Sequence, residues 1–225
     1  MHSTLLRLKN SLKNPILQRI ASGDSTVCDQ DYNFTESEVV NYTSCWNALS
    51  VASAFGHSAI VNRLLEIPAV IGNAHADNNW ALQEAVRYGH VDIVNCLLEI
   101  PAVSGNAHAA DNGALGAAAA NGHVDIVNRL LVIPEVSGNA HIPNNWALRL
   151  AAKYGHLAIV NRLLEIPAVS SNAHAEDNLA LRFAAGHGHL AIVNRLLEIL
   201  AVIGNAHAVD NHALRGAAAH GHLAV

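Results

Sequence analysis

The chain has 225 residues, of which 51% are apolar, 14% are charged and only 4% are aromatic, and its formal net charge is −5. This apolar content excludes an intrinsically disordered chain, and no membrane span is predicted because polar residues or proline interrupt every apolar run before the roughly 18 residues that a spanning helix requires. Since only 13 basic side chains stand against 18 acidic ones, the composition also argues against nucleic acid as a partner, whose phosphates require a basic surface.

Residues 1–46 form a segment of their own. Apolar residues recur at spacings of three and four between Leu5 and Ile20, which predicts two short amphipathic helices separated at Pro15. Gly23 lies 33 residues before Gly56, a glycine of the repeat described next, so residues 14–23 are expected to form a degenerate first helix that caps the array. Residues 24–46 contain five acidic side chains and no basic one, and we interpret them as an acidic linker. Because residues 1–23 are basic and free of acids, a mitochondrial transit peptide is the alternative.

A unit of 33 residues repeats along the rest of the chain. An Ala-Leu pair precedes each copy of the dipeptide Gly-His, and the first five copies are followed by Ile-Val-Asn and Leu-Leu. The six copies stand at 56–57, 89–90, 122–123, 155–156, 188–189 and 221–222. A fixed period in this range is typical of a solenoid, in which stacked neighbours bury the apolar faces that no unit buries alone. We therefore predict a repeat domain over residues 47–225, with five full repeats and a truncated sixth.

Each unit is predicted to contain two helices. In one of them, alanines and leucines at helical spacing follow Asn145 and predict a first helix, which Gly155 closes because glycine readily adopts the left-handed conformation. Asn145 is the expected N-cap, with its side-chain oxygen accepting a free amide of the first turn. Branched apolar residues form one stripe along Leu157–Glu165 and predict a second helix, which Pro167 stops. The Asn-Ala-His-Ala segment between units is predicted to be a loop, with a helical turn as the alternative.

The period, the paired helices, the Gly-His between them and the Ile-Val-x-x-Leu-Leu run together resemble ankyrin repeats. The resemblance covers residues 47–225 and implies an all-α fold, an ankyrin-repeat α-solenoid of stacked helix-turn-helix units. The chain departs from the family's Thr-Pro-Leu-His signature, since it reads Trp80-Ala81-Leu82-Gln83 at that place. It also carries a proline, such as Pro167, where the family usually has a glycine after the second helix.

The sequence stops at Val225, where the second helix of the last repeat is expected to begin. An open solenoid end exposes apolar surface that favours association. We therefore expect either a fragment of a longer protein or self-association through this uncapped end.

Fifteen histidines raise the question of a metal site. Equivalent residues on neighbouring helices lie about 8–10 Å apart, whereas two imidazoles on one zinc ion bring their nitrogens to within roughly 4 Å. We interpret the repeated histidines as polar ladders that bond to loop backbone between repeats, and we predict no metal and no cofactor. The two ladders are His57, His90, His123, His156, His189 and His222, and His75, His108, His141, His174 and His207.

No catalytic constellation is evident. The three cysteines are odd in number and lack a CxxC spacing, which indicates free thiols in a reducing compartment. Cys96 replaces an arginine that in other units, as at Arg63, stands three residues before a glutamate and predicts a solvated ion pair. Without a nucleophile beside a base or a glycine-rich phosphate loop, we predict that the chain is not an enzyme.

Comparison of the repeats with one another locates a candidate binding surface. The second helix is nearly constant, whereas variation concentrates on the first helix and the turn before it. The resemblance implies that this side is the concave face at which ankyrin stacks bind other proteins, and aromatic and arginine side chains commonly anchor interfaces. For the tryptophans, packing beneath the turn is the competing interpretation. The predicted partner-binding residues are Trp80, Glu84, Arg87, Tyr88, Trp146, Arg149, Lys153, Tyr154, Arg182, Phe183 and His187.

The sequence thus predicts a non-enzymatic module that binds a protein partner through its concave face. Its repeats are similar in style to ankyrin proteins of intracellular bacteria and amoebal giant viruses, which implies a bacterial effector, located in the cytoplasm or secreted into the cytosol of a host cell. Two alternatives stay open: the targeting arm of a longer enzyme whose catalytic domain lies outside this chain, and a structural stack that self-associates.

Overall fold

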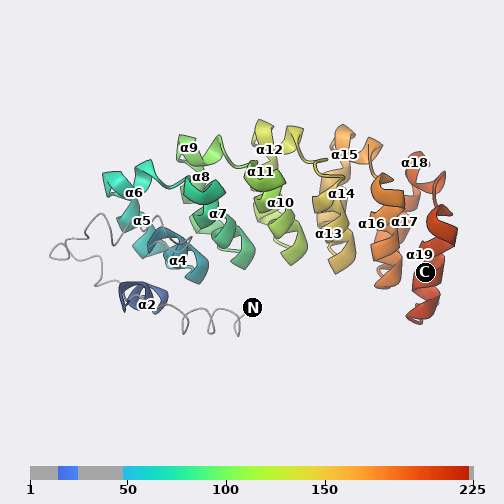
Figure 1. Ribbon diagram of the computed structural model, residues 1–225, viewed down its shortest axis with the longest axis horizontal. Coiled ribbons are helices and arrows are strands. Elements are labelled where there is room, and N and C mark those ends of the chain that lie inside the picture. The colour runs from blue at the N-terminus through green and yellow to red at the C-terminus, as the bar shows by residue number, and fades with distance from the viewer. Residues whose placement is uncertain (1–14, 25–47, 223–225) are drawn as a thin grey trace. The chain divides into compact units, whose positions relative to one another are not determined.

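The computed structural model describes residues 15–24 and 48–222, and all regular structure in these ranges is helical (Figure 1). The chain forms two compact units, Met1–Ala109 and Ala110–Val225, which are described one at a time. The helix expected before Pro15 and the acidic linker beyond Asp24 lie outside the described residues. The fold is an all-α solenoid, as the sequence predicts.

Unit 1 starts with a helix that takes the place of a first helix. This helix, α2 (Pro15–Ala21), packs against α4 (Ala48–Phe55), and Gly23 follows it with a φ of +75°, as a glycine with positive φ follows the later first helices. The unit continues with α5 (Ser58–Leu65), α6 (Pro68–Gly72), α7 (Ala76–Tyr88), α8 (Val91–Leu98) and α9 (Pro101–Ser104).

Unit 2 repeats the same order of helices. Its elements are α10 (Ala109–Asn121), α11 (Val124–Leu131), α12 (Pro134–Gly138), α13 (Trp146–Tyr154), α14 (Leu157–Leu164), α15 (Pro167–Ser171), α16 (Ala175–Gly186), α17 (Leu190–Leu197), α18 (Leu200–Ile203) and α19 (Ala208–Ala219). Successive first helices pack on one another, as α13 does on α16 and α16 on α19, and the second helices α14 and α17 pack on the first helices of their own repeats.

Each full repeat contains three helices, whereas the sequence predicts two. The predicted first and second helices are confirmed as α13 and α14, and Gly155 ends α13 with φ +83°. Ile166 is extended, with φ −84° and ψ 117°, because the proline after it excludes the helical region. Pro167 does stop α14, but it also begins the short helix α15, since proline at the first helical position has a suitable φ and needs no N–H.

The turn after the short helix confirms the predicted loop and leads into left-handed backbone. Residues 172–174 form a turn, and Glu176, Asp177 and Asn178 then have φ values of 54°, 54° and 58°. Asparagine and aspartate tolerate this conformation better than other side chains do. The polar run before each first helix therefore reverses the chain direction without a β-hairpin.

The predicted N-cap bond of Asn145 is wrong. Asn145 occupies the N-cap position of α13, with φ 56°, but its side chain makes no cap bond. Its buried amide donates instead to the carbonyl of Val169 in the short helix α15 of the same repeat, at 2.8 Å. The same bond, 24 residues forward, joins Asn79 to Val103, Asn112 to Val136, and Asn178 to Val202 at 2.8, 3.1 and 2.8 Å. These asparagines are struts that join the start of each first helix to the short helix of the same repeat.

The first histidine ladder is confirmed and runs in the opposite direction. The imidazole Nε2 of His189 donates to the carbonyl of Lys153, 36 residues earlier, at 3.0 Å. An added Cβ on Gly155 would lie 2.7 Å from this ring, so glycine is required there both for its φ and for its size. The same bond joins His57 to Ala21, His90 to Ala54, and His156 to Ala120 at 3.4, 3.1 and 3.1 Å.

The second histidine ladder is not formed in the described residues. The Nδ1 atoms of His108 and His141 are buried without a hydrogen-bond partner, and His75, His174 and His207 are exposed. The prediction is wrong for this series because two of these side chains are buried without an acceptor for Nδ1 and the other three face solvent. These histidines play no part in joining the repeats.

The core lies between the two rows of helices in each unit. In unit 2 the second helix α14 buries Ile159, Val160 and Leu163 completely, and the first helix α13 buries Ala151 and Ala152. Alanine lets the first helices approach one another closely, while the larger aliphatic side chains fill the space beside the second helices. Residues on the outer side of the first helices are therefore outside the core and accessible to other molecules.

Candidate partner-binding surface

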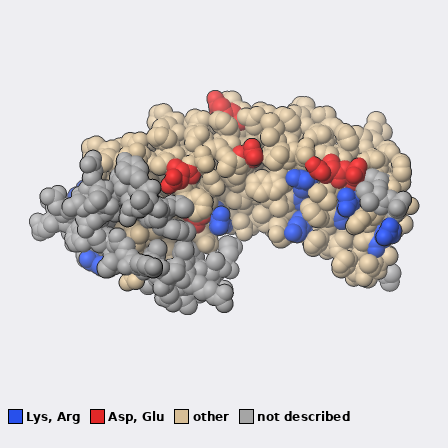
Figure 2. All heavy atoms as spheres, in the orientation of Figure 1, with Lys and Arg blue, Asp and Glu red and all other residues tan. Residues whose placement is uncertain are grey.

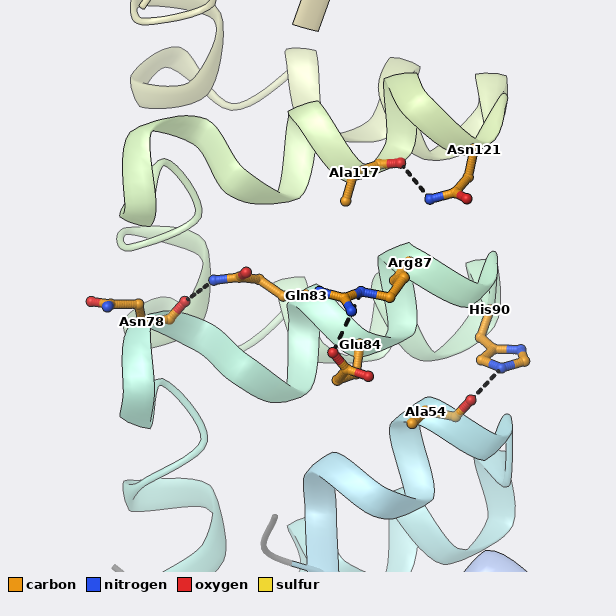
Figure 3. A network of polar contacts seen from close by, with 8 residues as sticks. All are labelled: Ala54, Asn78, Gln83, Glu84, Arg87, His90, Ala117 and Asn121. Atoms are coloured by element: carbon orange, nitrogen blue, oxygen red, sulfur yellow. Dashed lines mark hydrogen bonds and ion pairs between the residues drawn. The ribbon is translucent and has the colours of Figure 1, made fainter. Parts of the chain in front are cut away.

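We call the outer surface of the first helices the first-helix face and describe it separately in each unit. In unit 1 the predicted residues of this face lie on α7, which carries Trp80, Glu84, Arg87 and Tyr88. The Arg87 side chain is 50% exposed and Tyr88 is half-buried, so both are accessible to a partner. The Tyr88 ring lies 6.5 Å from that of His90. His90 in turn bonds to the carbonyl of Ala54 (Figure 3).

Glu84 is in the interior and not on the surface. Its side chain is 1% exposed, and its Oε1 lies 3.6 Å from the Nε of Arg87, which reaches over it from the next turn (Figure 3). Burial raises the pKa of the Glu84 carboxyl, and the Arg87 guanidinium opposes this shift only partly. The prediction that Glu84 contacts a partner is thus wrong. Glu84 instead lies beneath Arg87 and helps to position it.

Glu84 and Arg87 also act on the hydroxyl group of Tyr88. Burial and the negative charge of Glu84 raise the pKa of Tyr88, and Arg87 lowers it by less. Tyr88 is therefore a neutral hydrogen-bonding group at physiological pH.

The tryptophans are half-buried. The ring of Trp146 covers Gly116 on the preceding first helix, where an added Cβ would lie 2.4 Å from Cζ3. Trp80 occupies the equivalent position in unit 1 and is also half-buried. Packing thus buries part of each indole ring and leaves another part accessible. The sequence signal for the Trp146 contact is the glycine, since Gly116 interrupts an otherwise alanine-rich helix.

In unit 2 the structure brings four of the predicted residues together across two repeats. The ammonium of Lys153 lies 5.2 Å from the ring centroid of Tyr154 and 5.6 Å from that of Phe183. Tyr154 is 50% exposed. His187 donates from Nδ1 to the carbonyl of Phe183 at 2.9 Å, and its ring stacks on that of His189 at 6.1 Å. Lysine, tyrosine, phenylalanine and histidine thus form one contiguous patch.

Arginines form a column beside this patch. Arg149, Arg182 and Arg215 stand at the same position of α13, α16 and α19, and Figure 2 shows Lys and Arg gathered over this face of the three helices. The predicted site includes the first two and misses Arg215, although its position in the 33-residue register was sufficient to find it.

The other polar groups have structural roles. The expected surface ion pairs are confirmed for Arg162 with Glu165 at 2.6 Å and Arg195 with Glu198 at 2.7 Å, and Arg63 pairs with Glu66. Cys96 is a free thiol that donates to the Oδ1 of Asn62 at 3.3 Å. Within residues 15–24 and 48–222, no group of three or more His, Cys, Asp or Glu side chains is arranged to hold a metal ion.

The described helices, stacked with a 33-residue register, can be compared with known proteins. A family model described as ankyrin repeats in three copies matches residues 115–210. Residues 115–210 are therefore similar to ankyrin repeats. Ankyrin repeats are generally protein-interaction modules and are typically not catalytic. Among the described helices, none is both long and apolar enough to cross a membrane.

The chain can also be compared with individual curated proteins and solved structures. No curated protein matches the sequence significantly. A solved structure of an ankyrin repeat family protein from Legionella pneumophila is similar, with 21% sequence identity and a TM-score of 0.49. The alignment covers 93% of the present chain and 66% of the Legionella chain, which is just under two thirds of that protein.

Proposed function

We propose that this protein binds a protein partner through the first-helix face. The observation that carries the proposal is the contiguous patch of Lys153, Tyr154, Phe183 and His187, which presents aromatic and cationic groups on a rigid two-repeat surface. Aromatic side chains held in place by packing lose little entropy on binding and commonly supply most of the affinity at an interface.

Site-specific photocrosslinking tests this proposal. A photoreactive phenylalanine analogue at Phe183 is expected to crosslink a defined protein, and the same analogue at Asn128, an exposed residue of the second helix α11, is expected not to. The crosslink at Phe183 should disappear when Tyr154→Ala is added, because that substitution removes half of the aromatic patch. Equal crosslinking from both sites would contradict the proposal.

A finer proposal concerns where the protein acts. The similarity of its repeat style to ankyrin proteins of intracellular bacteria supports an effector that binds its partner in the cytosol of a host cell. A fusion to a reporter that becomes active only in eukaryotic cytosol, produced in an intracellular bacterium, tests this role. Delivery of the reporter is expected, and its retention in the bacterium would contradict the proposal.

Self-association is a second candidate function, and exposed apolar side chains favour it. Leu200 is 85% exposed and Leu214 is 66% exposed, and Leu214 also lines a cavity of about 360 Å³ with Leu181, Val193 and Leu197. Exposed apolar patches commonly mark association sites. Light scattering at several protein concentrations should show a dimer or larger species that Leu214→Arg abolishes. Val132, which is 70% exposed, gives the matched control Val132→Arg.

A further inference from the structure

Charge is segregated between the two rows of helices in unit 2. The second-helix arginines Arg162 and Arg195 are neutralised by glutamates three residues later, at 2.6 and 2.7 Å. The first helices instead carry Arg149, Lys153, Arg182 and Arg215, and among the described residues no carboxylate lies within ion-pair distance of these four. The first-helix face of unit 2 is therefore positively charged although the chain as a whole is acidic.

Two of these cations have unsatisfied donors. The Nε atoms of Arg149 and Arg182 are shielded from solvent and have no hydrogen-bond partner. Leaving a shielded donor without an acceptor is unfavourable, and more so when the donor is charged. Both guanidinium groups would gain from an acceptor supplied by a bound molecule.

The cations alternate with aromatic rings. Lys153 lies over the rings of Tyr154 and Phe183 at 5.2 and 5.6 Å, so the patch offers apolar ring surface beside each positive charge. A matching ligand has carboxylates separated by apolar side chains. Nucleic acid fits less well, because it requires a long uninterrupted basic surface and the acidic Glu176 and Asp177 stand in the turn at the start of α16.

We propose that the first-helix face of unit 2 binds an acidic protein segment in extended conformation. This proposal rests on the proposed function and names the chemistry of its partner. Packed helices are about 8–10 Å apart. An extended chain in the polyproline II conformation advances about 3.1 Å per residue with three residues per turn, so every third side chain points to the same side. A segment that runs across the repeats therefore meets the column of Arg149, Arg182 and Arg215 with an acidic side chain about every third residue.

Fluorescence anisotropy with a labelled peptide of four Glu-Val-Ser triplets tests this proposal. The peptide should bind the full chain at least about tenfold more tightly than its Gln-Val-Ser counterpart, and the affinity should fall as salt is raised. The double variant Arg149→Gln/Arg182→Gln should weaken binding about tenfold, because each exposed ion pair contributes roughly a threefold change in affinity.

The matched control is Arg129→Gln/Arg162→Gln, which removes the same charge from the second helices of the same unit. It should leave the affinity within about twofold, and circular dichroism should show both double variants to be folded. Equal binding of the two peptides, equal losses in both double variants, or tighter binding of a DNA duplex than of the acidic peptide would each overturn the proposal. If the Phe183 crosslink to a protein persists while the acidic peptide fails to bind, the proposed function stands and this inference falls.

Discussion

Replacing Asn145 by alanine tests whether the asparagine struts stabilise the fold of each repeat. Asn145 is 1% exposed, and its amide donates to the carbonyl of Val169 at 2.8 Å. Alanine removes this donor and leaves a buried carbonyl without its partner. The substitution also places a residue with a Cβ and no polar side chain at φ 56°.

The magnitude follows from these two losses. A buried carbonyl left unsatisfied costs about 1–3 kcal/mol, and alanine in the left-handed region costs about 1–2 kcal/mol. The Oδ1 of Asn145 is itself buried without a partner, so alanine also removes one unfavourable group. We therefore expect Asn145→Ala to lower the free energy of unfolding by about 2 kcal/mol and Asn145→Gly, which accepts the backbone conformation, by about 1 kcal/mol.

Urea unfolding followed by circular dichroism measures both values. The control is Asn128→Ala, which changes an exposed asparagine of α11 and should alter stability by less than about 0.5 kcal/mol. A loss of less than about 0.5 kcal/mol for both Asn145 variants would refute the strut. If alanine and glycine cost the same, the left-handed backbone contributes nothing to the effect.

Three further predictions concern other positions. Gly155→Ala should lower the free energy of unfolding by about 2–4 kcal/mol, since its Cβ would meet His189 at a φ of +83°, whereas Gly138→Ala, with nothing within 4 Å, should change it little in a thermal melt. Burial raises the pKa of the Glu84 carboxyl above 4.5, so the protonated form stabilises the folded state at low pH, and this stability is lost as pH rises from about 4.5 through the raised pKa. Glu84→Gln should therefore have a higher free energy of unfolding than the native chain at pH 7. A difference in free energy of unfolding between the two proteins that stays constant from pH 4 to pH 7 would contradict this. Burial and then the charge of a nearby glutamate raise the pKa of Cys96, so iodoacetamide should label it more slowly at pH 8 than a free cysteine peptide, as peptide mass mapping would show.

The helices could be predicted because the repeat displays each signal several times. Gly155 and Pro167 mark the ends of α13 and α14 by rules that depend only on local backbone sterics. The short helix α15 was missed because a proline that stops one helix can equally begin the next, and the sequence alone does not separate the two. Asn145 was interpreted as a local cap because its true acceptor, Val169, lies 24 residues later in the short helix α15, which the sequence did not predict.

The candidate surface was predictable in outline and less so in detail. Variation between repeats points to the first helices, and Lys153, Tyr154 and Phe183 do lie close together there. The same variation also selected Glu84, because a charged residue in a variable column is expected at the surface. Its burial under Arg87 depends on how the helices pack, which no sequence period encodes.

The histidine hydrogen bonds between repeats affect how the number of repeats in such a chain can change during evolution. Removing the 33 residues 145–177 would leave His189 at 36 residues after Ala120, the carbonyl that His156 uses now. This histidine bond is the same at each described junction where it forms, so recombination between copies can add or delete one whole repeat and keep the bond. A lineage can in this way widen or narrow its recognition surface in steps of one repeat while each remaining helix keeps its neighbours.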